Sequence, residues 1–248
     1  MKLIKTALLI LCVALSFTMF AQVQRDPITN QITNFQNATF SKDVTEFRFD
    51  NLGQGLQEHG IPYDKIDGSP FWKDSLLPAR FYDSKGYIIT LLARINIATN
   101  KIYFQQNGDE LVLNDDIITR IVFLEKDDSL VFISKVPDLL YKNKPLTDFV
   151  QVLNAGKYQL LRLTRRKVVS IESPSHTSTS YSFADEVSYF IKSDETVHDV
   201  RKLNRESILI FLPTSSAYDG WIKKNNINFR NEKDIVQFMN YYNTRFNN

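Results

Sequence analysis

The chain has 248 residues, of which 30 are Lys or Arg and 28 are Asp or Glu, so its formal charge at pH 7 is only +2. A balance this close to neutrality gives no indication of a nucleic-acid partner, since nucleic-acid-binding proteins usually carry a strongly basic surface. The single cysteine, Cys12, excludes a disulfide bond within the chain.

The segment 1–21 is typical of a secretory signal peptide. An apolar run from residue 7 to residue 20 follows two lysines and ends at Ala21, where a polar stretch begins. If Ala21 is the last residue removed, the mature chain has no cysteine, which excludes thiolate catalysis and cysteine-bound metals. A lipoprotein signal is the alternative, but it needs a small residue before the lipidated cysteine, and Leu11 precedes Cys12.

No later segment approaches the roughly 20 consecutive apolar residues that a membrane-spanning helix needs. We therefore expect an exported, soluble mature chain without a transmembrane span. Its net charge would be about zero, because the two lysines of the leader are lost.

Residues 22–67 are predicted to form an extended N-terminal arm. The stretch up to residue 50 is rich in Asn, Gln and Thr, and Gly and Pro residues interrupt the remainder. Aromatic residues are spaced along the arm, among them Phe35 and Phe40. Because a polar segment of this kind can order when it binds, we predict that Phe35 and Phe40 contact a protein partner.

Residues 68–172 predict an antiparallel β-meander. Apolar and polar side chains alternate from Tyr87 to Ile97, which is the pattern of a half-buried strand. Asn107-Gly108 is the dipeptide favoured in type I′ hairpins, and further strand patterns follow at close spacing. The run from Ile117 to Leu124 is apolar on both faces, so we expect it to be covered on both sides.

The aromatic pair Phe71 and Trp72 closes the approach to the meander. We favour a packing role, in which the pair anchors the arm on the sheet, because large aromatic side chains are mostly found in cores. Contact with a ligand or a protein partner is the alternative.

Charge is distributed unevenly along the sheet region. Residues 109–128 contain seven acidic and two basic residues, whereas residues 135–170 contain eight basic and two acidic residues. The strand predicted over 158–171 carries Arg162, Arg165 and Arg166. We favour complementary parts of one sheet, or a solvated strand face, and the alternative is a binding site for an acidic partner.

In the C-terminal part, the spacing of apolar residues changes from the alternation of strands to the spacing of helices. Residues 173–184 are Ser- and Thr-rich and predict a loop, and residues 185–248 predict an α/β cap. Asn204 can cap a first helix, a second is expected over 217–224, and Asn231 can cap the last. The last helix is amphipathic, with one face formed by Ile235, Phe238, Met239, Tyr242 and Phe246. The expected fold class is therefore α+β, a mainly antiparallel meander with a C-terminal helical segment packed on it.

No catalytic or metal-binding arrangement is evident. The histidines, His59, His176 and His198, are far apart and belong to no HExxH pattern. The acidic turns lack the alternating ligands and central Gly of a calcium loop, and no phosphate-binding Gly loop occurs. We predict that the protein is not an enzyme and needs no cofactor or metal.

Several segments carry motifs that are structural rather than catalytic. They are the run Gly68-Ser69-Pro70-Phe71-Trp72, residues 91–104, the Asn107-Gly108 turn, residues 117–123, the basic strand 161–167, the run Phe211-Leu212-Pro213 and the run Tyr241-Tyr242-Asn243. Together they resemble a family of uncharacterised exported proteins of Bacteroidota, from which this chain departs in its longer arm. The resemblance implies an envelope location and no established activity. A helical C-terminus does not resemble the β-rich sorting domain of the type 9 route, which favours the periplasm.

These observations predict a non-catalytic protein of the periplasm that binds another protein. The predicted role is an accessory subunit at the periplasmic side of an outer-membrane assembly. One alternative is a binder of a small amphipathic ligand, a lipid or a glycan, in a cavity lined by Trp72, Tyr103 or Phe104. A second alternative is a hydrolase, which requires His176 or His198 in a cleft beside a nucleophile.

Overall fold

The structure is a computed structural model that describes residues 49–51, 57–58, 61–113, 117–125, 129–134, 136, 140–141, 144–172, 179–193, 196–213 and 217–246. The described residues belong to one compact unit. The predicted signal peptide and most of the predicted arm lie outside them.

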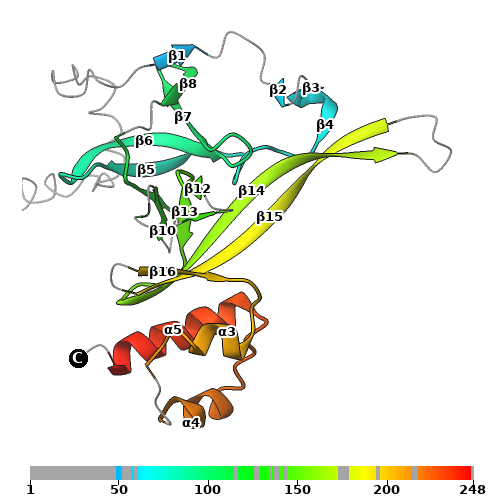
Figure 1. Cartoon of the computed structure of the whole chain (residues 1–248). Coiled ribbons are helices and arrows are strands. Elements are labelled where there is room, and N and C mark those ends of the chain that lie inside the picture. The colour runs from blue at the N-terminus through cyan, green and yellow to red at the C-terminus, as the bar shows by residue number, and fades with distance from the viewer. Residues whose placement is uncertain are drawn as a thin grey trace, which may run out of the picture. The chain divides into compact units, whose positions relative to one another are not determined.

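The elements follow one another in a long β-rich part and a short helical part (Figure 1). The strands are β1 Phe49–Asn51, β2 Gln57–Glu58, β3 Ile61–Pro62, β4 Ile66–Asp67, β5 Leu77–Tyr82, β6 Tyr87–Asn96, β7 Lys101–Gln106, β8 Asp109–Leu113, β9 Arg120–Leu124, β10 Ser129–Ile133, β11 Leu140–Tyr141, β12 Lys144–Pro145, β13 Val150–Val152, β14 Tyr158–Glu172, β15 Thr179–Ser193 and β16 Thr196–Val200. The helices are the 3₁₀ helix η2 Tyr63–Lys65 and the α-helices α3 Arg205–Leu209, α4 Ala217–Lys224 and α5 Glu232–Phe246.

Twelve of the strands form one sheet in the order β1-β8-β7-β6-β5-β9-β10-β13-β14-β15-β16, with β4 added in parallel beside β15. All the other pairings within this sheet are antiparallel, so the α+β fold class is confirmed. The order departs from a simple meander at several places, because β1 pairs with β8, β9 with β5, β10 with β13 and β4 with β15.

The turns form where the sequence supplies residues that tolerate a positive φ. Asn107 and Gly108 have φ of 54° and 92° and join β7 to β8, which is the pattern of a type I′ hairpin. Gly86 has φ of 134° in the turn between β5 and β6, where Asp83 accepts hydrogen bonds from the backbone of Lys85 and Gly86.

The apolar face predicted for β6 is confirmed, but on the opposite face Thr90 and Asn96 are buried too. All five side chains on the predicted apolar face are buried, namely Ile89, Leu91, Ala93, Ile95 and Ile97. Cover on both sides of the run 117–124 was only partly right. The strand starts at Arg120, and Ile121 and Phe123 are fully buried, but Val122 and Leu124 on the opposite face are only half-buried.

Strands β14 and β15 form the longest pairing of the sheet, a ribbon of 15 residue pairs that runs from Tyr158↔Ser193 to Glu172↔Thr179 (Figure 1). The prediction of a loop over 173–184 was therefore wrong for residues 179–184. Tyr181 and Phe183 alternate with small polar residues there, a pattern suited to a strand, and β14 supplies the hydrogen-bond partners.

The predicted boundary between a β-meander domain ending at residue 172 and a cap starting at residue 185 is not present in the structure. The ribbon crosses it, and β16 continues the same sheet beyond β15. Because hydrogen bonds link the two sides of that boundary along the whole ribbon, the cap is part of the sheet's own unit.

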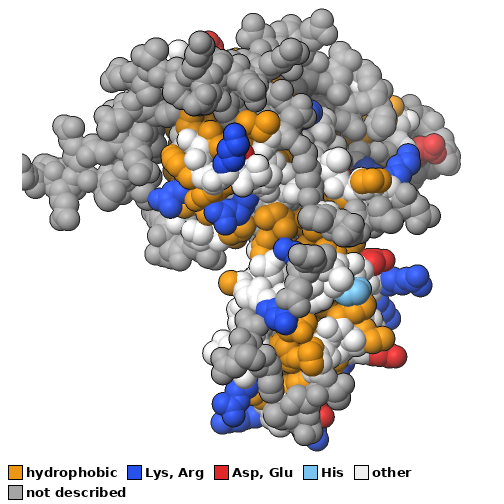
Figure 2. All heavy atoms as spheres, turned by 60° about the vertical axis from the view of Figure 1, so that its left-hand side comes forward, with side chains coloured by type: hydrophobic (Ala, Val, Ile, Leu, Met, Phe, Trp, Pro, Cys, Tyr) orange, Lys and Arg blue, Asp and Glu red, His pale blue; other side chains and the backbone are white. Residues whose placement is uncertain are grey.

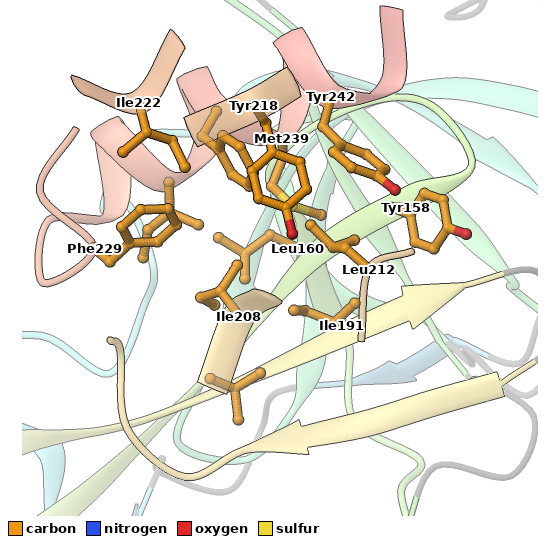
Figure 3. Close-up of a cluster of buried hydrophobic side chains, with 13 residues drawn as sticks. Tyr158, Leu160, Ile191, Ile208, Leu212, Tyr218, Ile222, Phe229, Met239 and Tyr242 are labelled. Atoms are coloured by element: carbon orange, nitrogen blue, oxygen red, sulfur yellow. The ribbon is translucent and has the colours of Figure 1, made fainter. Parts of the chain in front are cut away.

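The base of the ribbon is buried on both faces, because successive side chains of a strand point to opposite sides. Leu161, Leu163 and Phe190 face a small cluster with Val136, Leu146 and Val150. Leu160 and Ile191 face the helices, where they contact buried side chains of α3, α4 and α5 (Figure 3). The ribbon thus lies between two cores.

The helices begin where the sequence predicted. Asn204 caps α3 by accepting a hydrogen bond from the backbone N–H of Ser207, and Asn231 accepts from Lys233 at the start of α5. Ile235, Phe238, Met239 and Tyr242 of α5 are all buried. Among the described residues, no helix is both long and apolar enough to cross a membrane.

A pair of buried asparagines fixes α5 to the β13–β14 turn. Asn243 donates to the carbonyls of Ala155 and Tyr158 at 2.8 Å each and accepts from the Tyr158 N–H at 3.0 Å. Asn154 donates to the same two carbonyls and accepts from the Leu160 N–H at 2.7 Å. Gly156 has φ of 111°, and a Cβ there would lie 2.5 Å from Asn243, so only glycine fits this turn.

Candidate functional site

The predicted binding residues fall into three groups. Phe35 and Phe40 lie outside the described residues, and their role in binding a partner stays a prediction. Phe71 and Trp72 lie on the sheet, and the arginines Arg162, Arg165 and Arg166 lie along β14.

Phe71 and Trp72 anchor the segment that precedes β5 on the sheet, as the packing interpretation predicted. Phe71 is 6% exposed, meets Tyr103 edge to face at 5.2 Å, and is covered by the Arg94 guanidinium at 3.6 Å. The Trp72 ring packs against Phe123 and Phe132, and its backbone N–H donates to the Ile95 carbonyl at 2.9 Å. Phe71 therefore belongs to the core of the sheet, and the half-buried Trp72 packs against that core.

Arg162 links β14 to α5. Its guanidinium donates to the Glu232 carboxylate at 2.9 Å and to the Gln151 side chain at 2.5 Å. The Tyr189 hydroxyl donates to the same carboxylate at 2.8 Å. Burial, with the neighbouring Glu232 carboxylate, raises the pKa of Tyr189 to about 12, although Arg162 opposes the shift.

Arg165 and Arg166 are also paired within the chain. Arg165 forms two hydrogen bonds with the Asp148 carboxylate, at 3.0 and 2.6 Å, and Arg166 forms two with Asp185, at 2.6 and 3.1 Å. Arg166 also donates to the carbonyls of Ser69 and Phe71. The expectation that the acidic residues 109–128 complement this basic strand was therefore wrong for the three arginines, whose carboxylate partners are Glu232, Asp148 and Asp185.

These three arginines hold parts of the fold together. Each arginine donates two hydrogen bonds to one carboxylate, and the planar guanidinium group favours this kind of pairing. A further role in binding a partner stays a prediction, because an external carboxylate would have to compete with these internal ones.

The outer half of the ribbon, residues 166–172 with residues 179–185, has a different character. All of its side chains are half-buried or exposed, whereas the base of the ribbon includes fully buried side chains such as Leu160, Leu161 and Ile191. Val169 and Ile171 are 39% and 52% exposed. The other exposed large hydrophobic side chains among the described residues are Tyr87, Ile117, Val187 and Ile210. We call this half the outer ribbon.

The two faces of the outer ribbon are not equivalent. The register places Val169 opposite Ser182 and Ile171 opposite Ser180, so this face combines β-branched side chains on β14 with small ones on β15. On the other face, the Arg166 side chain reaches Ser69 and Phe71, which brings the chain before β5 across it. The face with Val169 and Ile171 is therefore the more open one.

Exposed hydrophobic side chains also occur away from the ribbon. On the face shown in Figure 2, they reach the surface in several places and lie among Lys and Arg side chains. Ile210, just after α3, is 71% exposed, and the neighbouring Phe211 ring stacks on His198 at 4.5 Å. Single exposed hydrophobic residues are common on soluble proteins, so these positions alone define no site.

The residues named for the two alternative functions are partly described, and both alternatives stay predictions. Tyr103 and Phe104 are 3% and 1% exposed, and the Tyr103 ring packs edge to face against Phe71. His198 lies against Phe211, and His59 and His176 lie outside the described residues. In the part of the chain that is described, no group of His, Asp or Glu side chains is close enough to hold a metal ion.

Sequence reasoning missed the outer ribbon because it treated residues 173–184 as a loop. The available signal was the alternation of Tyr181 and Phe183 with serines, next to a basic strand that is β-branched in its second half. Comparison of this chain with family profiles, with curated proteins and with solved structures finds no match. Its assignment to the Bacteroidota family remains a resemblance.

Proposed function

We propose that this chain is an exported, non-catalytic protein of the cell envelope that binds another protein, and that the outer ribbon provides the binding surface. The observation that carries the proposal is the exposure of Val169 and Ile171 on one face, opposite the small side chains of Ser182 and Ser180. Covering such side chains stabilises a complex by about 25 cal/mol per Å² of apolar surface removed from water.

The location and the accessory role rest on the sequence. The leader-like segment 1–21 supports export, and the polar arm with Phe35 and Phe40 supports a segment that orders on a partner. We propose the periplasmic side of an outer-membrane assembly as the place of action. The arm and the outer ribbon would then be two separate contact regions of one accessory subunit.

The test is a pull-down of the tagged protein from its native envelope in mild detergent, with the co-purifying proteins quantified. The ribbon variant is Ile171→Lys, which places a charge on the open face at a position that is 52% exposed. The matched control is Val187→Lys, which is 46% exposed and lies on the other face. A third variant lacks residues 22–48, and intact mass shows whether the mature chain starts after Ala21.

We expect Ile171→Lys to reduce recovery of the partner at least tenfold, because a charge in an apolar contact costs more than about 1.4 kcal/mol. Val187→Lys is expected to recover the partner at the wild-type level. Equal recovery by wild type and Ile171→Lys would remove the outer ribbon from the proposal. Loss of recovery on deletion of residues 22–48 alone would assign binding to the arm.

A further inference from the structure

We infer that the face of the sheet around Arg80 and Arg120 binds the phosphate groups of an anionic phospholipid surface. This face lies on β5, β6, β9 and β10, and not on the strands of the outer ribbon. The inference therefore goes beyond the proposed protein-binding function and does not depend on it. We call this surface the arginine face, and its residues are Pro78, Arg80, Tyr82, Thr90, Leu92, Arg120, Val122, Leu124 and Val131.

The strand register places the two arginines on the same side of the sheet. Arg80 of β5 lies opposite Val122 of β9, and Tyr82 lies opposite Arg120. Residues two apart on a strand point to the same side, so these four side chains share one face. Arg80 and Arg120 are thus diagonal neighbours with Cβ atoms about 7–8 Å apart, close enough for two long side chains to reach one ligand group.

Neither arginine forms an ion pair among the described residues. The Arg120 guanidinium lies over the Tyr82 ring at 3.9 Å, a contact that uses its flat face and leaves the N–H donors at its edge. The other arginines on the described strands of the sheet each donate to a carboxylate of the chain, and they are Arg94, Arg162, Arg165 and Arg166. Arg80 and Arg120 therefore differ from the arginines that hold the fold together.

A guanidinium without an acidic partner has donors that fit an external anion. Arg80 is half-buried, so part of its hydration is already lost, and an anion that binds it restores the missing hydrogen bonds. Guanidinium groups bind phosphate through two parallel N–H···O bonds, and a phosphate has enough oxygens to accept from two arginines. The pair is thus suited to a phosphate group.

The surroundings of the two arginines are apolar and aromatic. Val122 and Val131 lie side by side on β9 and β10 and are half-buried. Tyr82 and the 57% exposed Tyr87 meet edge to face at 5.8 Å. Tyrosine and arginine are typical of the boundary between water and lipid, where the apolar body and the polar tip of each side chain are both accommodated. These neighbours favour a phosphate carried by a lipid over a free phosphate ion.

The backbone of the arginine face is already used within the sheet. Strand β5 lies between β6 and β9, and β9 lies between β5 and β10. A peptide that binds as an added strand needs unpaired backbone groups at a sheet edge. Side chains alone must hold the ligand here, and a lipid headgroup requires nothing more than side-chain donors and apolar contacts.

The β5–β6 turn carries one acidic side chain, Asp83, next to Tyr82. Its carboxylate accepts hydrogen bonds from the backbone N–H groups of Lys85 and Gly86 at 2.7 and 2.9 Å. The exposed side chain of Lys85 offsets its charge. The turn therefore adds no net negative charge beside the two arginines.

The measurement is flotation of the full chain, purified from its native envelope, with lipid vesicles. One set of vesicles contains phosphatidylcholine alone, and the other contains about one third phosphatidylglycerol. We expect binding to the anionic vesicles to be roughly 25-fold stronger, because each of two arginines near such a surface contributes about fivefold. The difference should shrink as the salt concentration rises.

The variants Arg80→Gln and Arg120→Gln should each weaken binding to the anionic vesicles about fivefold. The matched control is Arg230→Gln, which removes the same charge at an exposed position between α4 and α5 and should change nothing. Arg120→Lys keeps the charge and should retain binding. All variants carry the same N-terminal residues, so a difference between them reports on the arginine face, and urea unfolding checks that each is folded.

Equal weakening by all three glutamine variants would overturn the inference, because binding would then depend on net charge alone. Equal binding of the wild type to both sets of vesicles would also overturn it. If no vesicle binds but Arg120→Gln loses binding of inorganic phosphate, the ligand is a free anion and the lipid surface is wrong.

The outcome is separable from that of the proposed function. Ile171→Lys should bind the anionic vesicles as the wild type does, whatever it does to recovery of a protein partner. If the vesicles do not bind and Arg80→Gln instead loses a protein in the envelope pull-down, the arginine face belongs to a protein contact and the lipid inference fails.

Discussion

Asn243 offers the sharpest test of how the helical part is held to the sheet. Its side chain is 7% exposed and makes three hydrogen bonds with the β13–β14 turn. In Asn243→Ala, the Tyr158 and Ala155 carbonyls each keep one hydrogen bond, because Asn154 also donates to both. The Tyr158 N–H, in contrast, loses its partner at a buried position.

The size of the effect follows from that difference. An unsatisfied buried donor costs about 1–3 kcal/mol. We therefore expect Asn243→Ala to lower the free energy of unfolding by about 2 kcal/mol, which for a unit of this size corresponds to a fall in Tm of about 4–8 °C. The assay is urea unfolding followed by circular dichroism, with an unchanged m-value.

Two further variants make the reasoning refutable. Asn240→Ala lies on the same helix at an exposed position and should change stability by less than about 0.5 kcal/mol. Asn243→Asp keeps the acceptor but turns a carboxylate oxygen toward two carbonyls, so it should destabilise more than alanine at pH 7 and recover near pH 4. If Asn243→Ala were as mild as Asn240→Ala, the asparagine clamp would not be what holds α5 in place.

Two other predictions concern the same region. Burial raises the pKa of Tyr242, which is 1% exposed, from about 10 to about 12. Burial of the neutral hydroxyl therefore contributes stability that is fully present below pH 10 and is lost as pH rises to 12. The expected loss in the free energy of unfolding is about 2 kcal/mol. Tyr242→Phe should abolish this loss when unfolding is measured across that pH range. Arg162→Met removes one of the donors to the half-buried Glu232 carboxylate and should lower the free energy of unfolding by about 1–2 kcal/mol. Adding Glu232→Gln to this variant should recover part of the lost stability. If the losses of the two single variants simply added in the double variant, the two residues would not be coupled.

Local signals were sufficient where one face of a strand or helix is buried and the turn residues are distinctive. The apolar face of β6, the Asn107-Gly108 turn and the apolar face of α5 depend on interactions over a few residues, and the structure confirms all three. The start of each helix was predictable for the same reason, since an N-cap is a contact between neighbours in sequence.

Pairing between distant strands was not predictable from these signals. Strand β9 pairs with β5, although three other strands, β6 to β8, separate them in the chain. Every strand edge offers the same backbone groups, so the choice of neighbour depends on how the buried faces pack. The ribbon was missed for a related reason, because a Ser- and Thr-rich segment becomes a strand when a partner strand is available.

The residues of the candidate site were also only partly predictable from the sequence. The sequence identified Phe71 and Trp72 as an anchor from residue type alone, and it located the arginines of β14. It could not assign their partners, because Arg162 pairs with Glu232, 70 positions away. It also could not show that Val169 and Ile171 are exposed, since β-branched residues in a strand are as often buried.

By itself the sequence determined the fold class, the hairpin turn at Asn107-Gly108 and the starts of the α-helices, because each depends on composition or on contacts within a few residues. Export stays a prediction. Only the tertiary structure decided the strand order, the internal partners of the arginines and the exposure of Val169 and Ile171. These features depend on which distant segments of the chain pack together and exclude water, and on how their backbone groups then form hydrogen bonds.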